Sequence, residues 1–277
     1  PRFADGRGFK LKRVWTIDEA PSGVLYTGVD EAALFRSADA GETWSEVASL
    51  SDHPTRPHWS PGNGGLCLHT VVVDPHDERR MWVAISAVGA FRTDDGGETW
   101  ELKTRGLPPV PTGGDGDDID RCVHRMALDP RSRDTLYMQC HGGVFRSDDA
   151  ADSWYPVETG LPSNFGFPIV ATGPGEAFVA PLDSDERRFM PAGRLRVYRT
   201  RDGGASWQDA SRGLPEEPQF VNVLRGAMAK DPADPGGVFF GTTMGQVYGT
   251  RDGGESWEQL PLQLPRVLSV TAHRVGA

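Results

Sequence analysis

Thr93-Asp94-Asp95-Gly96-Gly97-Glu98-Thr99-Trp100 is the most informative segment of this chain for its architecture, because variants of this eight-residue box occur five times. The shared pattern is Ser/Thr-x-Asp-x-Gly-x-Thr/Ser-Trp, and the other copies occupy residues 37–44, 147–154, 200–207 and 250–257. The five tryptophans that end the boxes are spaced by 56, 54, 53 and 50 residues (Trp44, Trp100, Trp154, Trp207 and Trp257). A repeat of about 50 residues built from strands and turns predicts a radial array of small sheets.

Each repeat shows the same order of strand signals. An apolar strand closed by an Asp-Pro turn comes first, then a second β-rich run, then a third strand that ends near Phe/Tyr-Arg, and the box leads into a fourth. The predicted first strands are 67–73, 122–128 and 223–229, and the predicted second strands are 81–86, 135–140 and 238–242. Four antiparallel strands per repeat predict an all-β fold, a β-propeller with five visible blades.

The whole chain is predicted to form one propeller domain, residues 1–277. The predicted blades span residues 9–52, 66–108, 121–161, 165–214 and 220–263, and residues 266–275 are predicted to close the ring or to start a further blade. The chain starts at Pro1 without a methionine, and this favours a longer natural protein with blades upstream.

The box has a structural role in this interpretation. Its Asp accepts hydrogen bonds from the N–H groups of the turn, its Gly takes a positive φ, and its Trp packs between sheets. The third copy has Ala151 where Gly is usual, so we expect its turn to be the most strained.

Composition excludes several classes of protein. With 277 residues, a net charge of −10 and a pI near 5.2, the chain lacks the basic face that a nucleic-acid partner needs. No stretch approaches 18 uncharged apolar residues, which argues against a membrane span. Three cysteines and no visible signal peptide favour a reducing cytoplasm.

The repeats resemble the Asp-box (BNR) repeats of bacterial sialidases, sortilin-type receptors, xyloglucan-hydrolysing propellers and a photosystem assembly factor. More closely, the chain is similar to bacterial BNR-repeat or glycosyl-hydrolase-like proteins. The resemblance implies a propeller of about six to eight blades. It leaves function open, because these relatives include both enzymes and binding scaffolds.

Superposition of the repeats brings four side chains to one position on the innermost strands. They are Arg13, His69, His124 and Arg225, and Pro168 is the nearest match in the fourth blade. Arginine and histidine can bind a carboxylate, phosphate or sulfate. The alternative is that they pair with acidic groups of the channel or contact water.

Every cysteine lies within two residues of a histidine, as in Cys67-x-His69, Cys122-x-His124 and Cys140-His141. Thiolate and imidazole suit zinc or copper, and His69, His124 and His141 are the predicted metal ligands. The alternative is that the cysteines are small core residues. No cofactor follows with certainty.

Sialidase chemistry is disfavoured, because the five tyrosines all lie within or beside strands and none is available as a nucleophile. Other glycosidases need two carboxyl groups. The candidates are Asp30, Glu31, Asp115, Asp117, Asp118, Asp120 and Asp183. Of all titratable groups, Glu31, Asp120 and His141 are the predicted acid–base residues.

We therefore expect a propeller that binds a small polar or anionic, sugar-like ligand at the channel rim, with hydrolysis left open. One alternative is a non-catalytic scaffold that presents its face to a protein partner. The other is a metal-dependent enzyme that uses the Cys/His cluster.

Overall fold

The computed structural model describes residues 1–4, 6–109 and 119–273. The chain divides into two compact units, residues 1–123 with 149–154, and residues 124–148 with 155–277. The division falls inside one strand, between Val123 and His124.

The first unit contains the first two four-stranded sheets, each antiparallel and ordered as in the sequence. Their strands are β1 (Arg13–Glu19), β2 (Leu25–Asp30), β3 (Ala33–Ser37) and β4 (Ser45–Glu46), then β5 (Leu68–Val73), β6 (Met81–Ile85), β7 (Gly89–Thr93) and β8 (Glu101–Leu102). The 3-10 turn η1 (Arg56–His58) and the α-helix α1 (Ala48–Ser51) connect them. In the part of the chain that the structure describes, no helix has the length and apolarity to cross a membrane.

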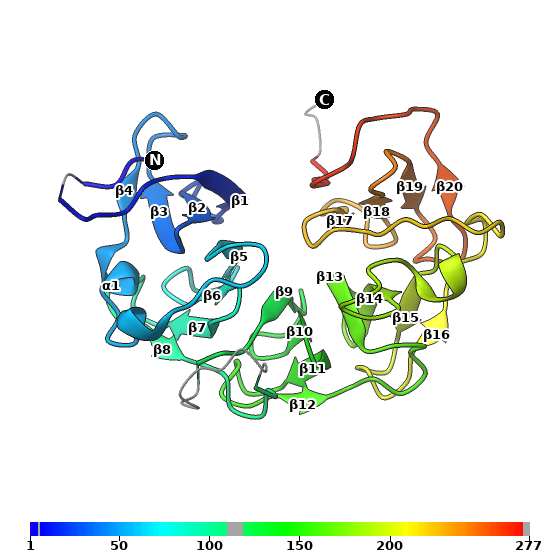
Figure 1. Ribbon diagram of the computed structural model, residues 1–277, viewed down its shortest axis with the longest axis horizontal. Coiled ribbons are helices and arrows are strands. Elements are labelled where there is room, and N and C mark those ends of the chain that lie inside the picture. Colours follow the sequence, from blue (N-terminus) through cyan, green and yellow to red (C-terminus); the bar gives the residue numbers. More distant parts are fainter. Residues whose placement is uncertain (5, 110–118, 274–277) are drawn as a thin grey trace. The chain divides into compact units, whose positions relative to one another are not determined.

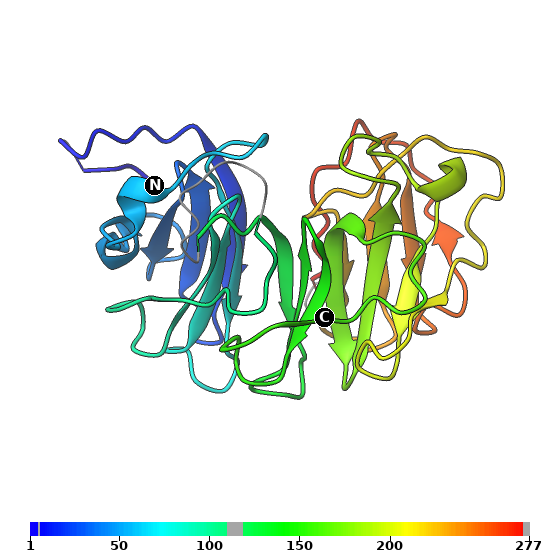
Figure 2. The same ribbon diagram turned by 60° about the horizontal axis from the view of Figure 1, so that its bottom comes forward.

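The second unit contains the other three sheets, apart from Val123 and the box turn 149–154. Their strands are β9 (Val123–Leu128), β10 (Leu136–Cys140), β11 (Gly143–Ser147) and β12 (Tyr155–Pro156), then β13 (Phe165–Gly173), β14 (Glu176–Leu182), β15 (Tyr198–Thr200) and β16 (Gln208–Asp209), then β17 (Met228–Lys230), β18 (Val238–Gly241), β19 (Val247–Thr250) and β20 (Glu258–Gln259). The 3-10 turn η2 (Pro191–Gly193) lies between β14 and β15. Within this unit β9, β13 and β17 lie on the inner side of their sheets (Figure 1), and the turned view shows β13 and β14 side by side (Figure 2).

The fold prediction is confirmed, since five four-stranded antiparallel sheets form the blades of an all-β propeller. The second strands begin and end within one residue of their predicted bounds.

Two predicted strands are wrong. In the fifth blade the strand predicted at 223–229 is reduced to β17, because a turn in which Ala227 N–H donates to the Leu224 carbonyl interrupts the chain before it. The strand predicted at 266–275 does not form over residues 266–273, where Ser269 makes an isolated parallel bridge to Gly226.

The Asp boxes form the same turn in all five blades. In the second blade, Asp95 Oδ1 accepts the Thr99 backbone N–H at 2.9 Å and Asp95 Oδ2 accepts the Thr99 hydroxyl at 2.6 Å. These donors lower the pKa of Asp95 to about 2, with the hydroxyl making the largest contribution. In the third box Ala150 and Ala151 both have positive φ, 58° and 76°, which agrees with the expected strain.

Two box tryptophans of the second unit join neighbouring blades. Trp207 Nε1 donates to the Val157 carbonyl at 2.7 Å and Trp257 Nε1 to the Ala210 carbonyl at 2.6 Å, each in the preceding blade. The indoles are buried in the apolar layers between sheets, so the box fixes the contact between blades as well as its own turn.

Candidate functional site

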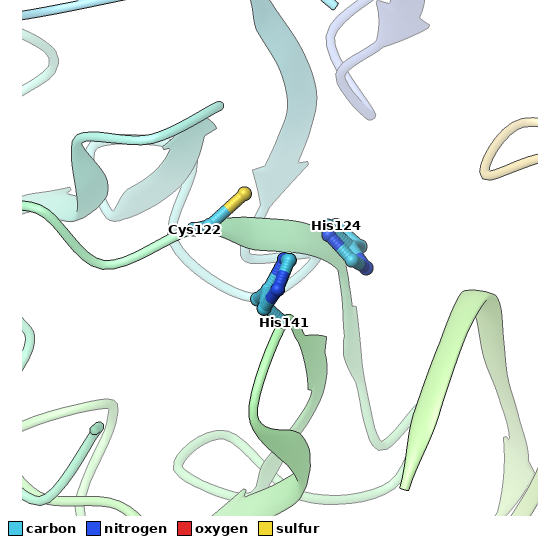
Figure 3. A group of neighbouring side chains, drawn as sticks. All are labelled: Cys122, His124 and His141. Atoms are coloured by element: carbon cyan, nitrogen blue, oxygen red, sulfur yellow. The ribbon is translucent and has the colours of Figure 1, made fainter. Parts of the chain in front are cut away.

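Three potential metal donors meet in the third blade. Cys122 directly precedes β9, His124 lies on β9, and His141 begins the turn from β10 to β11. One donor atom from each side chain lies within 4.8 Å of the others (Figure 3). The sheet geometry explains this, because residues two apart on a strand share a face, and the end of β10 lies beside the start of β9.

Aromatic rings surround the two histidines. The His124 ring lies 5.3 Å from the Phe165 ring and 4.9 Å from the Phe167 ring, and the His141 ring lies 5.3 Å from Phe165 (centroid distances). The two imidazoles are 5.8 Å apart in an edge-to-face arrangement. His124 is therefore buried, while His141 keeps about a third of its side chain exposed, 31%.

Two arginines complete the cluster. Arg188 comes from the long β14–β15 connection and lies 5.8 Å over the Phe167 ring, and Arg225 lies at the same distance from that ring. Arg188 donates to Asp185, and the other carboxyl oxygen of Asp185 lies 3.6 Å from His141 Nε2. We call His141, Asp185, Arg188 and Arg225, with their aromatic support, the rim cluster.

The surroundings of His124 keep its ring neutral. Its Nδ1 lies 2.5 Å from the Gly166 carbonyl oxygen, which indicates that Nδ1 carries the proton. Burial first, and then the charge of Arg225, lowers the pKa of His124 to about 3. A neutral histidine with a fixed tautomer can serve as a metal ligand but not as an acid at neutral pH.

The remaining predicted residues lie in the first unit. His69 is 1% exposed and uses both ring nitrogens, Nδ1 with Thr70 Oγ1 at 2.9 Å and Nε2 with the Val123 carbonyl at 3.0 Å. The trio that the structure brings together is therefore Cys122, His124 and His141, where the sequence predicted His69 in place of the cysteine.

The other first-unit candidates are engaged locally. Arg13 is exposed and lies 5.0 Å over the Trp15 ring. Glu31 forms an ion pair with Lys12. Asp120 is buried with a positive φ of 67°. Of the further carboxyl candidates, Asp115, Asp117 and Asp118 lie outside the described residues.

Sequence reasoning missed Glu158. Among the carboxyl groups of the described residues whose pKa is shifted, Glu158 is the one with a raised pKa. Burial raises this pKa more than the hydrogen bond from the Val144 N–H lowers it. It lies against Gly143, two residues from His141. A glutamate at that place has no sequence signal, because the contact with Gly143 is made only in the folded chain.

Comparisons with known proteins agree with the fold. A profile of the BNR/Asp-box repeat family matches residues 91–102. The chain is 26% identical over 251 residues to xyloglucanase Xgh74A of Acetivibrio thermocellus, covering 77% of this chain and 27% of that protein. It is 23% identical to an oligoxyloglucan-reducing end-specific xyloglucanase of Emericella nidulans, covering 68% of this chain and 26% of that protein.

A solved structure shows the same architecture. The GH74 xyloglucanase from Xanthomonas campestris superposes with a TM-score of 0.64 at 20% identity, over 90% of this chain and 38% of that one. The chain thus spans about a quarter of the length of these curated relatives and just over a third of the solved chain. Repeat boxes, blade topology and structural likeness agree: the chain is a β-propeller built from BNR/Asp-box repeats.

Proposed function

We propose that this chain is a glycan-binding, glycosyl-hydrolase-like propeller whose ligand site is the rim cluster of the second unit. The observation that carries the proposal is the grouping of Arg188, Arg225, Asp185 and His141 over the Phe165 and Phe167 rings. The xyloglucanases among its relatives support a sugar as the ligand class.

The chemistry of the cluster suits a polyhydroxylated ligand. An arginine–aspartate pair offers donors and acceptors side by side, so it can bind neighbouring sugar hydroxyls, and a second guanidinium adds a forked donor for a carboxylate. The rings below hold the guanidinium groups in place, which reduces the entropy lost on binding.

The test is calorimetric titration of the whole chain with neutral xyloglucan oligosaccharides and, separately, with uronic-acid oligosaccharides. Arg225→Met should weaken binding at least tenfold, because it removes a charged donor and keeps the apolar stem. Arg194→Met is the control, since Arg194 is an exposed arginine on the β14–β15 connection that also carries Arg188. Binding of neither sugar, or equal binding by both variants, would refute the proposal.

Hydrolysis requires an acid with a second carboxyl about 5–10 Å away. Glu158 is the acid that we propose, because it lies against Gly143, two residues from His141, and burial raises its pKa. Release of reducing sugar from xyloglucan by the wild type, lost in Glu158→Gln while binding persists, would extend the function to hydrolysis.

A protein-binding scaffold is the second candidate. Phe220 and Met244 in the fifth blade are 72% and 62% exposed. In this second proposal, the two exposed apolar side chains form part of a surface for a protein partner. Loss of sugar binding in Phe220→Ser would instead place Phe220 in the glycan site.

A further inference from the structure

We propose that Cys122, His124 and His141 bind a zinc ion through three protein ligands, with a fourth position left open. This goes beyond glycan binding, because no part of that proposal requires a metal. The geometric basis is that one donor atom from each residue lies within 4.8 Å of the others.

The backbone supplies two of these ligands together. Cys122 and His124 are separated only by Val123, with Cys122 directly before β9 and His124 on it (Figure 3). His141 enters from the turn after β10, and this turn is fixed by Gln139, whose Nε2 donates to the carbonyls of Cys140 and Gly143 at 3.0 and 3.2 Å.

The distances fit zinc after a small adjustment. Tetrahedral zinc with bonds of about 2.0–2.3 Å holds its donor atoms roughly 3.3–3.8 Å apart. The donor atoms, which lie up to 4.8 Å apart, must therefore move about 1–1.5 Å closer together. Side-chain rotation of the partly exposed Cys122 and His141 can supply this movement.

The groups behind the histidines are those expected of metal ligands. A metal-binding histidine usually donates its other ring N–H to a carbonyl or a carboxylate, which fixes the ring. His124 Nδ1 lies 2.5 Å from the Gly166 carbonyl oxygen, and His141 Nε2 lies 3.6 Å from Asp185 Oδ2. In the proposed site, His124 Nε2 and His141 Nδ1 would therefore be the ligand atoms.

The donor set indicates the kind of metal. One thiolate and two imidazoles suit zinc. None of the three cysteines forms a disulfide.

The second blade provides an internal comparison. Cys67 and His69 repeat the Cys-x-His spacing, but both ring nitrogens of His69 are hydrogen bonded. The turn between β6 and β7, residues 86–88, contains Ser, Ala and Val and supplies no third ligand. Cys67 is therefore a matched control, a cysteine before a histidine that should not bind the metal.

The test is titration of the chelator-treated, untagged whole chain with Zn²⁺ by calorimetry, and with Co²⁺ by absorption spectroscopy. We expect one ion per chain with sub-micromolar affinity and a thiolate-to-cobalt charge-transfer band. Cys122→Ala and His141→Gln should each weaken zinc binding at least 100-fold, and Asp185→Asn about 10–100-fold. Cys67→Ala should leave the affinity unchanged.

Several outcomes would overturn the assignment: no stoichiometric binding, a cobalt spectrum without the thiolate band, an equal effect of Cys67→Ala, or selective binding of Cu⁺ with no zinc. Circular dichroism of each metal-free variant controls for misfolding, and His141→Gln changes a partly exposed turn residue, so it remains informative if Cys122→Ala fails to fold. Zinc binding measured without any sugar keeps this result separate from the glycan proposal.

Discussion

Glycine at position 106 should be far less replaceable than glycine at position 96, although both have left-handed backbones in the same unit. Gly96 has φ +80° and no atom within 4 Å of the place where a Cβ would be. Gly106 has φ +93°, and its Cβ would lie closer than 3.0 Å to the Trp154 carbonyl oxygen. The pair therefore separates backbone strain from steric exclusion.

Backbone strain and steric exclusion each lower the free energy of unfolding by an amount that can be approximated. A left-handed alanine is strained by about 1–2 kcal/mol, and the lower entropy of the unfolded chain offsets about 0.4–1 kcal/mol of this. Gly96→Ala should therefore lower the free energy of unfolding by about 1 kcal/mol. Gly106→Ala must also displace the Trp154 peptide by about 1 Å. That shift breaks the Trp154 N–H bond to Arg105 O (2.9 Å) and the Trp154 Nε1 bond to Lys103 O (3.0 Å). At about 1 kcal/mol per bond, the total is about 3 kcal/mol.

Thermal unfolding followed by calorimetry would measure the difference. At roughly 2–4 °C per kcal/mol for a chain of this size, we expect Gly96→Ala to lower Tm by about 3 °C and Gly106→Ala by about 10 °C. Gly160 and Gly213, which approach Trp207 and Trp257 in the same way, should behave like Gly106. An equal fall in Tm for Gly96→Ala and Gly106→Ala would show that the contact with Trp154 does not constrain Gly106.

Further predictions concern charges and turns. Arg80→Ala should lower the free energy of unfolding, measured by urea titration, by about 3–5 kcal/mol, because it leaves the fully buried Asp74 carboxylate without the guanidinium that binds it at 2.7 Å. Arg79→Ala is the control: Arg79 is 73% exposed, so its loss should leave the free energy of unfolding unchanged. Because the folded pKa of Asp95 is about 2 and an unfolded Asp titrates near about 3.9, its stabilisation is present above pH 4 and lost as pH falls to 2. Asp95→Asn should flatten that part of a plot of Tm against pH, and an unchanged slope would contradict the assignment. Ala40→Gly should raise the free energy of unfolding, measured by chemical denaturation, by about 0.5–1 kcal/mol, because the φ of +56° strains an alanine at this exposed position. A lower free energy of unfolding would show that the methyl group of Ala40 stabilises the fold.

Local sequence signals predicted most of the fold. The box requires one turn geometry, because its Asp, hydroxyl and Gly residues satisfy one another within eight positions, and the second strands are apolar runs with clear boundaries. Prediction failed in the fifth blade, where a local turn and a contact with a distant residue replace regular strand pairing. The strand expected at 223–229 is cut short by a local turn, and the Gly226 carbonyl accepts the N–H of Val270.

The same division holds for the candidate site. The repeat, the blades and the unusual Cys-x-His spacing can be predicted from the amino-acid sequence, because they are patterns of near neighbours along the chain. Folding brings two hydrogen-bond partners to His69, whereas it places His124 against His141 beside Asp185 and two arginines. Identical spacing in two blades thus gives different chemistry. The physical reason is that hydrogen-bond occupancy and burial are set by residues from other strands, which spacing within one strand cannot specify.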